Sequence, residues 1–190
     1  GMPFVLSGRN SYIGWGIANS MIDDCDFFIE KVDRSLNYYT SADSSIVKFD
    51  FQKDTIKVKN QEANVYYQRF TNRSPVISDF HIPFSDIFSD KLTNTLPVMT
   101  KYVITYSWTG SFISDEFTTL YRLTRAKNWL DFSNSFKSWV APSFNFVYGD
   151  KDGNIGLLTA GAVPLRNEKT TMVIPNPGWL KEYGWSHLLK

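Results

Sequence analysis

The chain has 190 residues, of which 43% are hydrophobic and 21% charged, and its 20 basic and 19 acidic side chains give a formal net charge of +1. Six Trp, ten Tyr and fifteen Phe supply enough apolar surface for a folded core, which argues against a disordered chain. A charge near zero without a Lys/Arg block argues against nucleic acid or an anionic membrane as a partner. No apolar run approaches the roughly 20 residues that span a bilayer.

The amino terminus and the metal-binding residue types limit the expectations further. Gly1 before Met2 is expected to be a remnant of expression cloning, and the charged-then-apolar pattern of a signal peptide is missing, so the compartment stays unknown. The single cysteine, Cys25, excludes an internal disulfide, and His81 and His187 are too few nitrogen ligands for a typical zinc hydrolase site. We expect no transition metal.

The first third of the chain has the pattern of short strands. Val5-Leu6 and the run 12–17 surround the turn residues 7–11, which predicts a hairpin. The apolar run 26–32 predicts a strand that emerges from a core, and the polar stretch 33–45 predicts a surface loop.

Apolar and polar residues then alternate for about thirty residues from Val47 onward. This period of two predicts an antiparallel meander with one face in water, ended by the segment 74–79. The stretch 80–97, which contains His81, is rich in turn residues, and strand character resumes over 98–108.

Two helices are predicted after these strands. Ser114 is the expected N-cap of the first, with Asp115 and Glu116 in its first turn. One side of this helix is expected to carry Phe117, Leu120, Tyr121 and Thr124. The second starts at Asn128 or Asp131 and ends before Pro142, and its expected apolar positions are Leu130, Phe132, Phe136, Trp139 and Val140.

A clear hairpin follows, with strands at 144–148 and 155–159 and Asp152-Gly153 at its tip. The order of strands, helices and strands favours the α+β class with antiparallel sheets. No Gly-rich phosphate loop opens either helix, which argues against a dinucleotide fold.

The acidic cluster Asp23-Asp24-Cys25-Asp26 leaves two interpretations open. Two carboxylates and a backbone carbonyl are oxygen ligands that a calcium ion accepts, but a charged turn that enters a strand has the same composition. The turn 150–154 lacks the downstream Glu of an EF-hand and is expected to be a plain hairpin turn.

Three other residues are candidates for a site. Cys25 is flanked by aspartates, which disfavour its thiolate, so an ordinary small side chain is the expected role rather than a nucleophile. Asn145 stands among apolar strand residues, where an amide must either find a structural partner or project into a site. Arg166 would by default be a surface arginine.

Three segments together resemble the penicillin acylase (penicillin amidase) family of N-terminal nucleophile hydrolases. They are GRNSYIGWGIANSMIDDCDFFIEKV, then RSPVISD, then AKNWLDFSNSFKSWVAPSFNFVYGDKDGNIGLLTAGAVPLR after the Trp108 strand. The resemblance covers nearly all of the chain. It implies a single partial domain over 1–190, an internal piece of the β-chain region and of the four-layer αββα fold.

The resemblance also implies roles for individual residues. The backbone N–H of Asn19 and the side chain of Asn145 would form an oxyanion hole, in which two donors stabilise a tetrahedral oxyanion. Arg166 would orient the nucleophile's amine and Asn145, and Met21 would line the acyl pocket. The family's calcium site would comprise Asp23, the Cys25 carbonyl and Asp26.

The sequence departs from the family in two respects. The family's nucleophile is a serine exposed by autoproteolysis, whose own α-amine is the base. Neither Gly1 nor Ser7 nor Ser11 stands at its position. In addition, the segment 72–74 is Asn-Arg-Ser where relatives usually have an Arg-His-Gly-like turn.

Two functions from different classes are therefore open. The first is a segment of an amidohydrolase that acts on a small acyl amide, inactive without the missing serine, with calcium but no organic cofactor. The second is a non-catalytic domain of the same fold that binds a ligand or partner. By family analogy the protein would be periplasmic or secreted. Exposed strand edges would favour a homo-oligomer.

Overall fold

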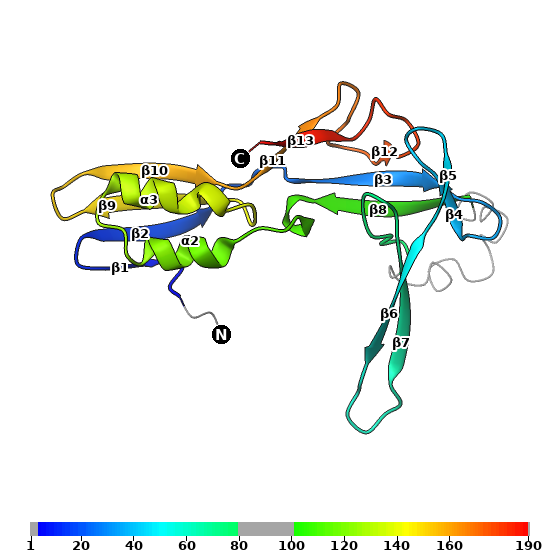
Figure 1. The fold of residues 1–190 in the computed structure, drawn as a ribbon, viewed down its shortest axis with the longest axis horizontal. Coiled ribbons are helices and arrows are strands. Elements are labelled where there is room, and N and C mark those ends of the chain that lie inside the picture. Colours follow the sequence, from blue (N-terminus) through cyan, green and yellow to red (C-terminus); the bar gives the residue numbers. More distant parts are fainter. Residues whose placement is uncertain (1–3, 80–100, 190) are drawn as a thin grey trace. The chain divides into compact units, whose positions relative to one another are not determined.

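A computed structural model describes residues 4–79 and 101–189 of the chain (Figure 1). Contacts within the chain group it into two compact units. The first comprises Gly1–Asp24, Trp108–Leu165 and Ser186–Lys190, and the second comprises Cys25–Ser107 and Arg166–Trp185. Each unit is described by itself.

The elements of the described residues are mainly short strands. In chain order they are β1 (Gly8–Arg9), β2 (Ile13–Asn19), β3 (Cys25–Lys31), β4 (Tyr38–Thr40), β5 (Ile46–Lys48), β6 (Asp50–Ile56), β7 (Asn64–Phe70), β8 (Tyr102–Trp108), η1 (Thr109–Ser111), α2 (Glu116–Leu123), α3 (Trp129–Ser135), η2 (Phe136–Ser138), β9 (Phe144–Asp150), β10 (Ile155–Ala160), β11 (Val163–Arg166), β12 (Asn176–Pro177) and β13 (Trp185–Leu189). None of the helices in this part of the chain is long and apolar enough to cross a membrane.

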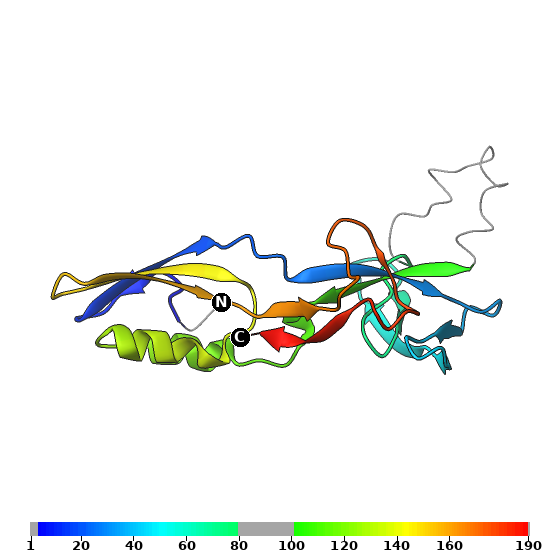
Figure 2. The same ribbon diagram turned by 90° about the horizontal axis from the view of Figure 1, so that it is seen from above.

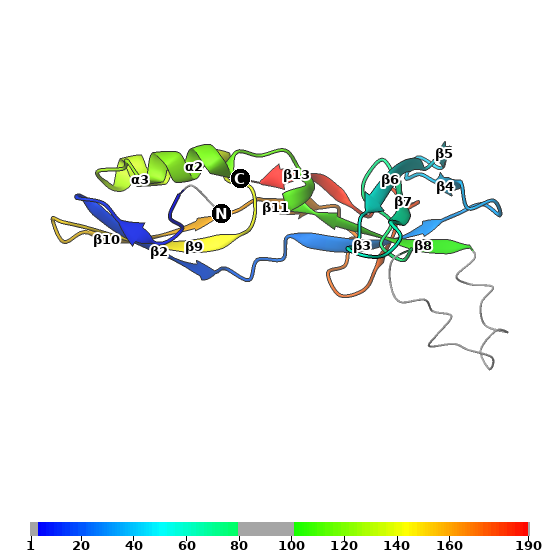
Figure 3. The ribbon, with the colours of Figure 1, turned by 90° about the horizontal axis from the view of Figure 1, so that it is seen from below.

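The first unit is built on a four-stranded sheet in the order β1-β2-β9-β10. All of its neighbouring strands are antiparallel. Both helices lie on the same face of this sheet, as Figures 2 and 3 show from opposite sides. A side chain on β2, β9 or β10 therefore faces either the helices or the outer face, and successive residues alternate between the two.

The helix-facing side forms the core of the first unit. Its fully buried centre includes Phe132, Leu123 and Phe146, and the rings of Phe136 and Phe146 have centroids 4.3 Å apart. The core cluster comprises Ile13, Trp15, Leu120, Leu123, Ala126, Phe132, Phe136, Trp139, Phe146, Tyr148 and Ala160.

The outer face of the sheet carries small or apolar side chains in two of its rows. Gly14, Gly149 and Ile155 form one row, and Gly16, Val147 and Leu157 form the next. The apolar residues among these are largely exposed: Val147 by 51%, Leu157 by 63% and Ile155 by 89%. The third row, Ala18, Asn145 and Thr159, is where polar side chains enter this face.

The second unit contains a three-stranded sheet in the order β12-β3-β8, together with the pairs β4-β5 and β6-β7. The short pair β12-β3 is parallel, whereas β4-β5 and β6-β7 are antiparallel. Its core cluster comprises Tyr39, Phe49, Val76 and Val103.

The α+β class and most of the predicted strands are confirmed, with three differences. The first strand of the amino-terminal hairpin is Gly8–Arg9 rather than 5–6. The expected loop 33–45 contains β4, which pairs with β5. The alternation after Val47 predicted one buried face, yet every residue of β6 is exposed because β6 and β7 form an isolated two-stranded ribbon. The predicted turn-rich stretch 80–97 lies outside the described residues.

Both predicted helices are present, but two details were wrong for the first. Its N-cap is Asp115, whose carboxylate accepts the Thr118 N–H at 2.9 Å, rather than Ser114. Its buried residues are Thr119, Leu120 and Leu123, so the side with Phe117 and Tyr121 is the more exposed one. Phe117 and Tyr121 make edge contacts with the ring of Phe4 instead.

The second helix and the following hairpin are confirmed more closely. Asn128 is the N-cap of α3 and accepts the Asp131 N–H at 2.9 Å. Of the expected apolar positions, Leu130 is 66% exposed and the others are buried. The helix is shorter than predicted, because α3 ends at Ser135 and Phe136, Trp139 and Val140 lie beyond it. Asp150 accepts hydrogen bonds from the backbone and side chain of Asn154, so the turn 150–154 is held by its own residues.

Candidate oxyanion site

Asn145 projects from the outer face of the sheet in the first unit. It lies opposite Ala18 of β2 and Thr159 of β10. The side-chain Oδ1 of Asn145 accepts a hydrogen bond from Thr159 Oγ1 at 2.7 Å. Its Nδ2 makes no hydrogen bond to the residues that the structure describes. A neutral amide with a free N–H₂ group is a suitable donor to a developing negative charge.

The backbone N–H of Asn19 is placed by the register of β2 and β9. The Lys151 N–H donates to the Tyr12 carbonyl at 2.9 Å. Tyr12 and Lys151, which directly precede the pair Ile13 and Asp150, are therefore a hydrogen-bonded pair. Hydrogen-bonded and non-hydrogen-bonded pairs alternate along an antiparallel ladder, so Asn19 and Phe144 form a non-hydrogen-bonded pair. The Asn19 N–H therefore points away from β9, at a stretch of β2 that β1 does not cover.

A cavity of about 320 Å³ opens beside Asn19. It is lined by Asn19, Met21, Ile22, Asp24, Pro142, Ser143 and Phe144. Met21 is 82% exposed and has a φ of +54°, and its N–H donates to Asn19 Oδ1 at 3.0 Å. This local turn fixes the end of β2 and places the predicted pocket residue at the cavity.

Arg166 lies in the second unit, where it forms a buried cluster with Asp26 and Trp185. Arg166 Nε donates to Asp26 Oδ2 at 2.8 Å, and Trp185 Nε1 donates to the same oxygen at 2.5 Å. The Asp26 side chain is 2% exposed and that of Arg166 is 13% exposed. Arg166 Nη2 also lies 3.4 Å from the Cys25 carbonyl oxygen. The guanidinium thus neutralises a buried carboxylate.

These contacts bear on the predicted calcium ligands. Within residues 4–79 and 101–189, no group of three His, Cys, Asp or Glu side chains could hold a metal ion. Asp23 belongs to the first unit, whereas Cys25 and Asp26 belong to the second. The Asp26 carboxylate and the Cys25 carbonyl both face Arg166, so the residues as placed do not fit a calcium ion. The calcium site stays a prediction from the resemblance.

Two perturbed titratable groups lie away from these residues. Burial and the hydrogen bond to Asp150 raise the pKa of Tyr148 to about 12. Burial also raises the pKa of Glu30, and the charge of Arg73 and the hydrogen bond from Thr105 offset part of this rise. Both side chains pack inside their units and have structural contacts, so neither is assigned to the candidate site.

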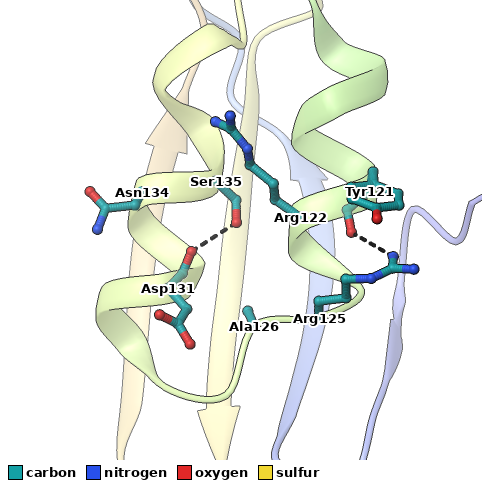
Figure 4. A pocket seen from close by; sticks show the side chains of 7 residues that line it. All are labelled: Tyr121, Arg122, Arg125, Ala126, Asp131, Asn134 and Ser135. Atoms are coloured by element: carbon teal, nitrogen blue, oxygen red, sulfur yellow. Dashed lines mark hydrogen bonds between the residues drawn. The ribbon is translucent and has the colours of Figure 1, made fainter.

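A second cavity, of about 330 Å³, lies between the two helices (Figure 4). Its lining residues are Tyr121, Arg122, Arg125, Ala126, Asp131, Asn134 and Ser135. Two of the contacts drawn there hold the local backbone: Arg125 Nη1 donates to the Tyr121 carbonyl, and Ser135 Oγ donates to the Asp131 carbonyl. This cavity lies on the helix side of the sheet, away from the face that carries Asn145.

Two residues of these sites were missed in the sequence. Thr159 could have been found, because the predicted turn at Asp152-Gly153 sets the hairpin register that brings it opposite Asn145. Trp185 carried no such signal, since 159 positions separate it from Asp26 and no local pattern predicts their contact.

Comparison with solved structures and curated proteins defines the class. The chain matches a structure of thermostable penicillin G acylase from Alcaligenes faecalis with a TM-score of 0.79 at 22% identity, covering 99% of this chain and 31% of that one. Its fold is therefore that of an N-terminal nucleophile hydrolase. The family model for penicillin amidase matches residues 1–190, and the chain belongs to the penicillin amidase family.

Curated relatives agree with this assignment. Penicillin G acylase of Escherichia coli is 27% identical over 187 residues, covering 98% of this chain and 20% of the relative. Acyl-homoserine lactone acylase QuiP of Pseudomonas fluorescens strain Pf0-1 is 28% identical over 189 residues, covering 97% of this chain and 21% of the relative. The chain thus spans about a fifth of the length of these relatives.

Proposed function

We propose that this chain is the oxyanion-stabilising segment of a longer amidohydrolase that cleaves a small acyl amide through a serine acyl-enzyme. The observation that carries the proposal is the register of β2 with β9. It places a backbone N–H free of the ladder and a side-chain amide at the same end of adjacent strands. The relatives are named as acylases of penicillin G and of acyl-homoserine lactones, which suggests an acyl amide as the substrate class.

In the proposed reaction, the serine attacks the amide carbonyl carbon and the carbonyl oxygen becomes negatively charged. Asn145 Nδ2 and the Asn19 N–H would donate to this oxygen. Because neither group titrates near neutral pH, both would stabilise the oxyanion over the whole pH range in which the enzyme works. The proposed role of Arg166, which is to orient the nucleophile's amine and Asn145, rests on the family resemblance alone.

The proposed nucleophile is not one of the serines near the amino-terminal hairpin of this chain. Ser11 lies in the turn before Ile13 of β2, and Ser7 precedes Gly8, which pairs with Trp15, whereas Asn19 ends the strand. Six residues of extended chain separate Ile13 from Asn19, which is about 20 Å at 3.3 Å per residue. On this proposal the 190-residue chain is inactive by itself.

Kinetics of the full-length protein test the proposal. With chromogenic phenylacetyl and longer acyl amides as substrates, we expect Asn145→Ala to lower kcat by about 100-fold or more, the usual effect of removing one oxyanion donor. Asn134→Ala, which removes an exposed amide on α3, is the matched control and should keep wild-type activity. Full activity in Asn145→Ala would refute the proposal. A wild-type protein without any amidase activity would favour a non-catalytic binding domain.

The calcium prediction has its own test. A calcium ion at Asp26 would have to share the carboxylate with Arg166, and its removal would lower the melting temperature. A melting temperature that does not change when a calcium chelator is added would argue against a stabilising calcium ion at Asp26.

A further inference from the structure

Thr159 and Asn145 occupy a special position in the β9-β10 hairpin. The Asp150 N–H donates to the Asn154 carbonyl at 2.9 Å, which makes these two residues a hydrogen-bonded pair. By alternation along the ladder, Asn145 and Thr159 form a non-hydrogen-bonded pair. Side chains approach most closely in such pairs, which explains the 2.7 Å hydrogen bond from Thr159 Oγ1 to Asn145 Oδ1.

In the structure this hydrogen bond engages the oxygen end of the amide and leaves the Nδ2 end available. A primary amide can present either its oxygen or its NH₂ group by rotation about one bond, and only the NH₂ group stabilises an oxyanion. With Oδ1 held by the Thr159 hydroxyl, Nδ2 is turned away from β10. In a rotated amide, Nδ2 would instead donate to Thr159 and the oxygen would face the substrate, where it would repel the developing charge.

Two rows of the ladder, the one that holds the pair and the next one toward the Asp152-Gly153 turn, offer no other polar side chain. Ala18 completes the same row, and the adjacent row consists of Gly16, Val147 and Leu157. None of these side chains has a hydrogen-bonding group, so the Thr159 hydroxyl is the polar side chain that the two rows provide for Asn145.

We propose that Thr159 is a positioning residue that fixes the Asn145 amide with its Nδ2 toward the oxyanion; this inference rests on the proposed function. Thr159 itself does not touch the substrate. Its effect on catalysis is therefore carried by Asn145, and it should change kcat rather than KM.

Two measurements test the role. The first records the side-chain amide signals of Asn145 by ¹⁵N NMR in the 190-residue chain, where Asn145→Ala identifies the signals by their loss. Thr159→Val removes the hydroxyl at nearly constant shape and should shift these signals, and Thr159→Ser should restore them. Thr55→Val, an exposed strand threonine on β6, is the matched control and should leave them unchanged.

The second measurement is kcat and KM of the same variants in the full-length protein. Thr159→Val should lower kcat about five- to tenfold, the effect expected for one lost neutral hydrogen bond, with KM within about twofold. Thr159→Ser should recover most of kcat, and equal melting temperatures would exclude a merely structural loss.

The outcomes separate the two proposals. If Thr159→Val leaves both the amide signals and kcat unchanged while Asn145→Ala loses activity, the positioning role is wrong and the oxyanion proposal stands. If Asn145→Ala keeps full activity, the oxyanion proposal fails and the catalytic role of Thr159 fails with it, even where the NMR shift shows their contact.

Discussion

Replacing Asp26 by alanine removes the carboxylate at the centre of the Asp26, Arg166 and Trp185 cluster. The side chain of Asp26 is 2% exposed, and it accepts Arg166 Nε at 2.8 Å and Trp185 Nε1 at 2.5 Å. Removing one partner of a buried ion pair typically costs about 3–5 kcal/mol, because the other charge stays buried. The Arg166 side chain keeps 13% exposure and its contact with the Cys25 carbonyl, which favours the lower end of that range.

We therefore expect Asp26→Ala to lower the free energy of unfolding by about 3 kcal/mol. For a chain of this size that corresponds to a fall in melting temperature of about 6–12 °C. Urea denaturation followed by circular dichroism measures the free energy, and a heat melt measures the temperature.

Two further variants separate the charge from the shape. Asp26→Asn keeps an oxygen acceptor and should cost less than Asp26→Ala, whereas Arg166→Met leaves the buried carboxylate without this cation and should cost at least as much. The double variant should cost less than the sum of the single ones because the residues interact directly. A cost below about 1 kcal/mol for Asp26→Ala would refute the buried-pair interpretation.

Three further predictions concern other parts of the chain. Burial of Glu116 tends to raise its pKa, but the Val140 N–H and other donors hold the pKa below the ordinary value of 4.5. The ionised carboxylate therefore stabilises the native state above that pH, and this stabilisation is lost as the pH falls below it. Glu116→Gln should flatten the acid limb of a stability-pH curve. A Cβ at Gly178 would overlap the buried Glu30 carboxylate, so Gly178→Ala should lower the free energy of unfolding by about 1–3 kcal/mol in urea denaturation. The 190-residue chain should self-associate through the exposed outer face of β9 and β10, and Leu157→Lys should reduce the mass measured by light scattering.

A specific result would contradict each of these three predictions. An acid limb that is the same in Glu116→Gln and wild type would remove the role of that carboxylate. Gly149→Ala is the control for the glycine test, because a Cβ there meets no atom closer than 3.9 Å. Equal stability of the Gly178→Ala and Gly149→Ala variants would argue against the overlap. A monomeric wild-type chain would contradict self-association.

Local chemistry was sufficient to predict the elements that hold the candidate site. The Asp-Gly turn predicted the β9-β10 hairpin. Asn128 was one of the two residues predicted to start the second helix, and its short side chain satisfies a free N–H there. The N-cap and the buried face of the first helix were predicted wrongly. Asp115 and Ser114 are both good caps and are adjacent, and an eight-residue helix is too short for its apolar period to fix the buried face.

Contacts between distant segments could not be predicted in this way. The exposure of β6 depends on what packs against the ribbon, which its alternating sequence does not reveal. The ion pair of Asp26 with Arg166 joins residues 140 positions apart, whereas the sequence alone left a calcium ligand and a charged turn open for the same carboxylate. Asn145 was predicted as a site residue from the family resemblance, since its spacing alone was compatible with a structural role.

The most direct test of the central claim, that Asn145 donates to an oxyanion, is the affinity of the full-length protein for a tetrahedral transition-state analogue such as a phosphonate of the acyl group. An interaction made only with the tetrahedral oxyanion should contribute to binding of the analogue and not of the planar amide. We predict that Asn145→Ala binds the analogue about 100-fold more weakly, while its affinity for the substrate amide is unchanged. An equal loss of affinity for both ligands, or no loss for the analogue, would contradict the claim.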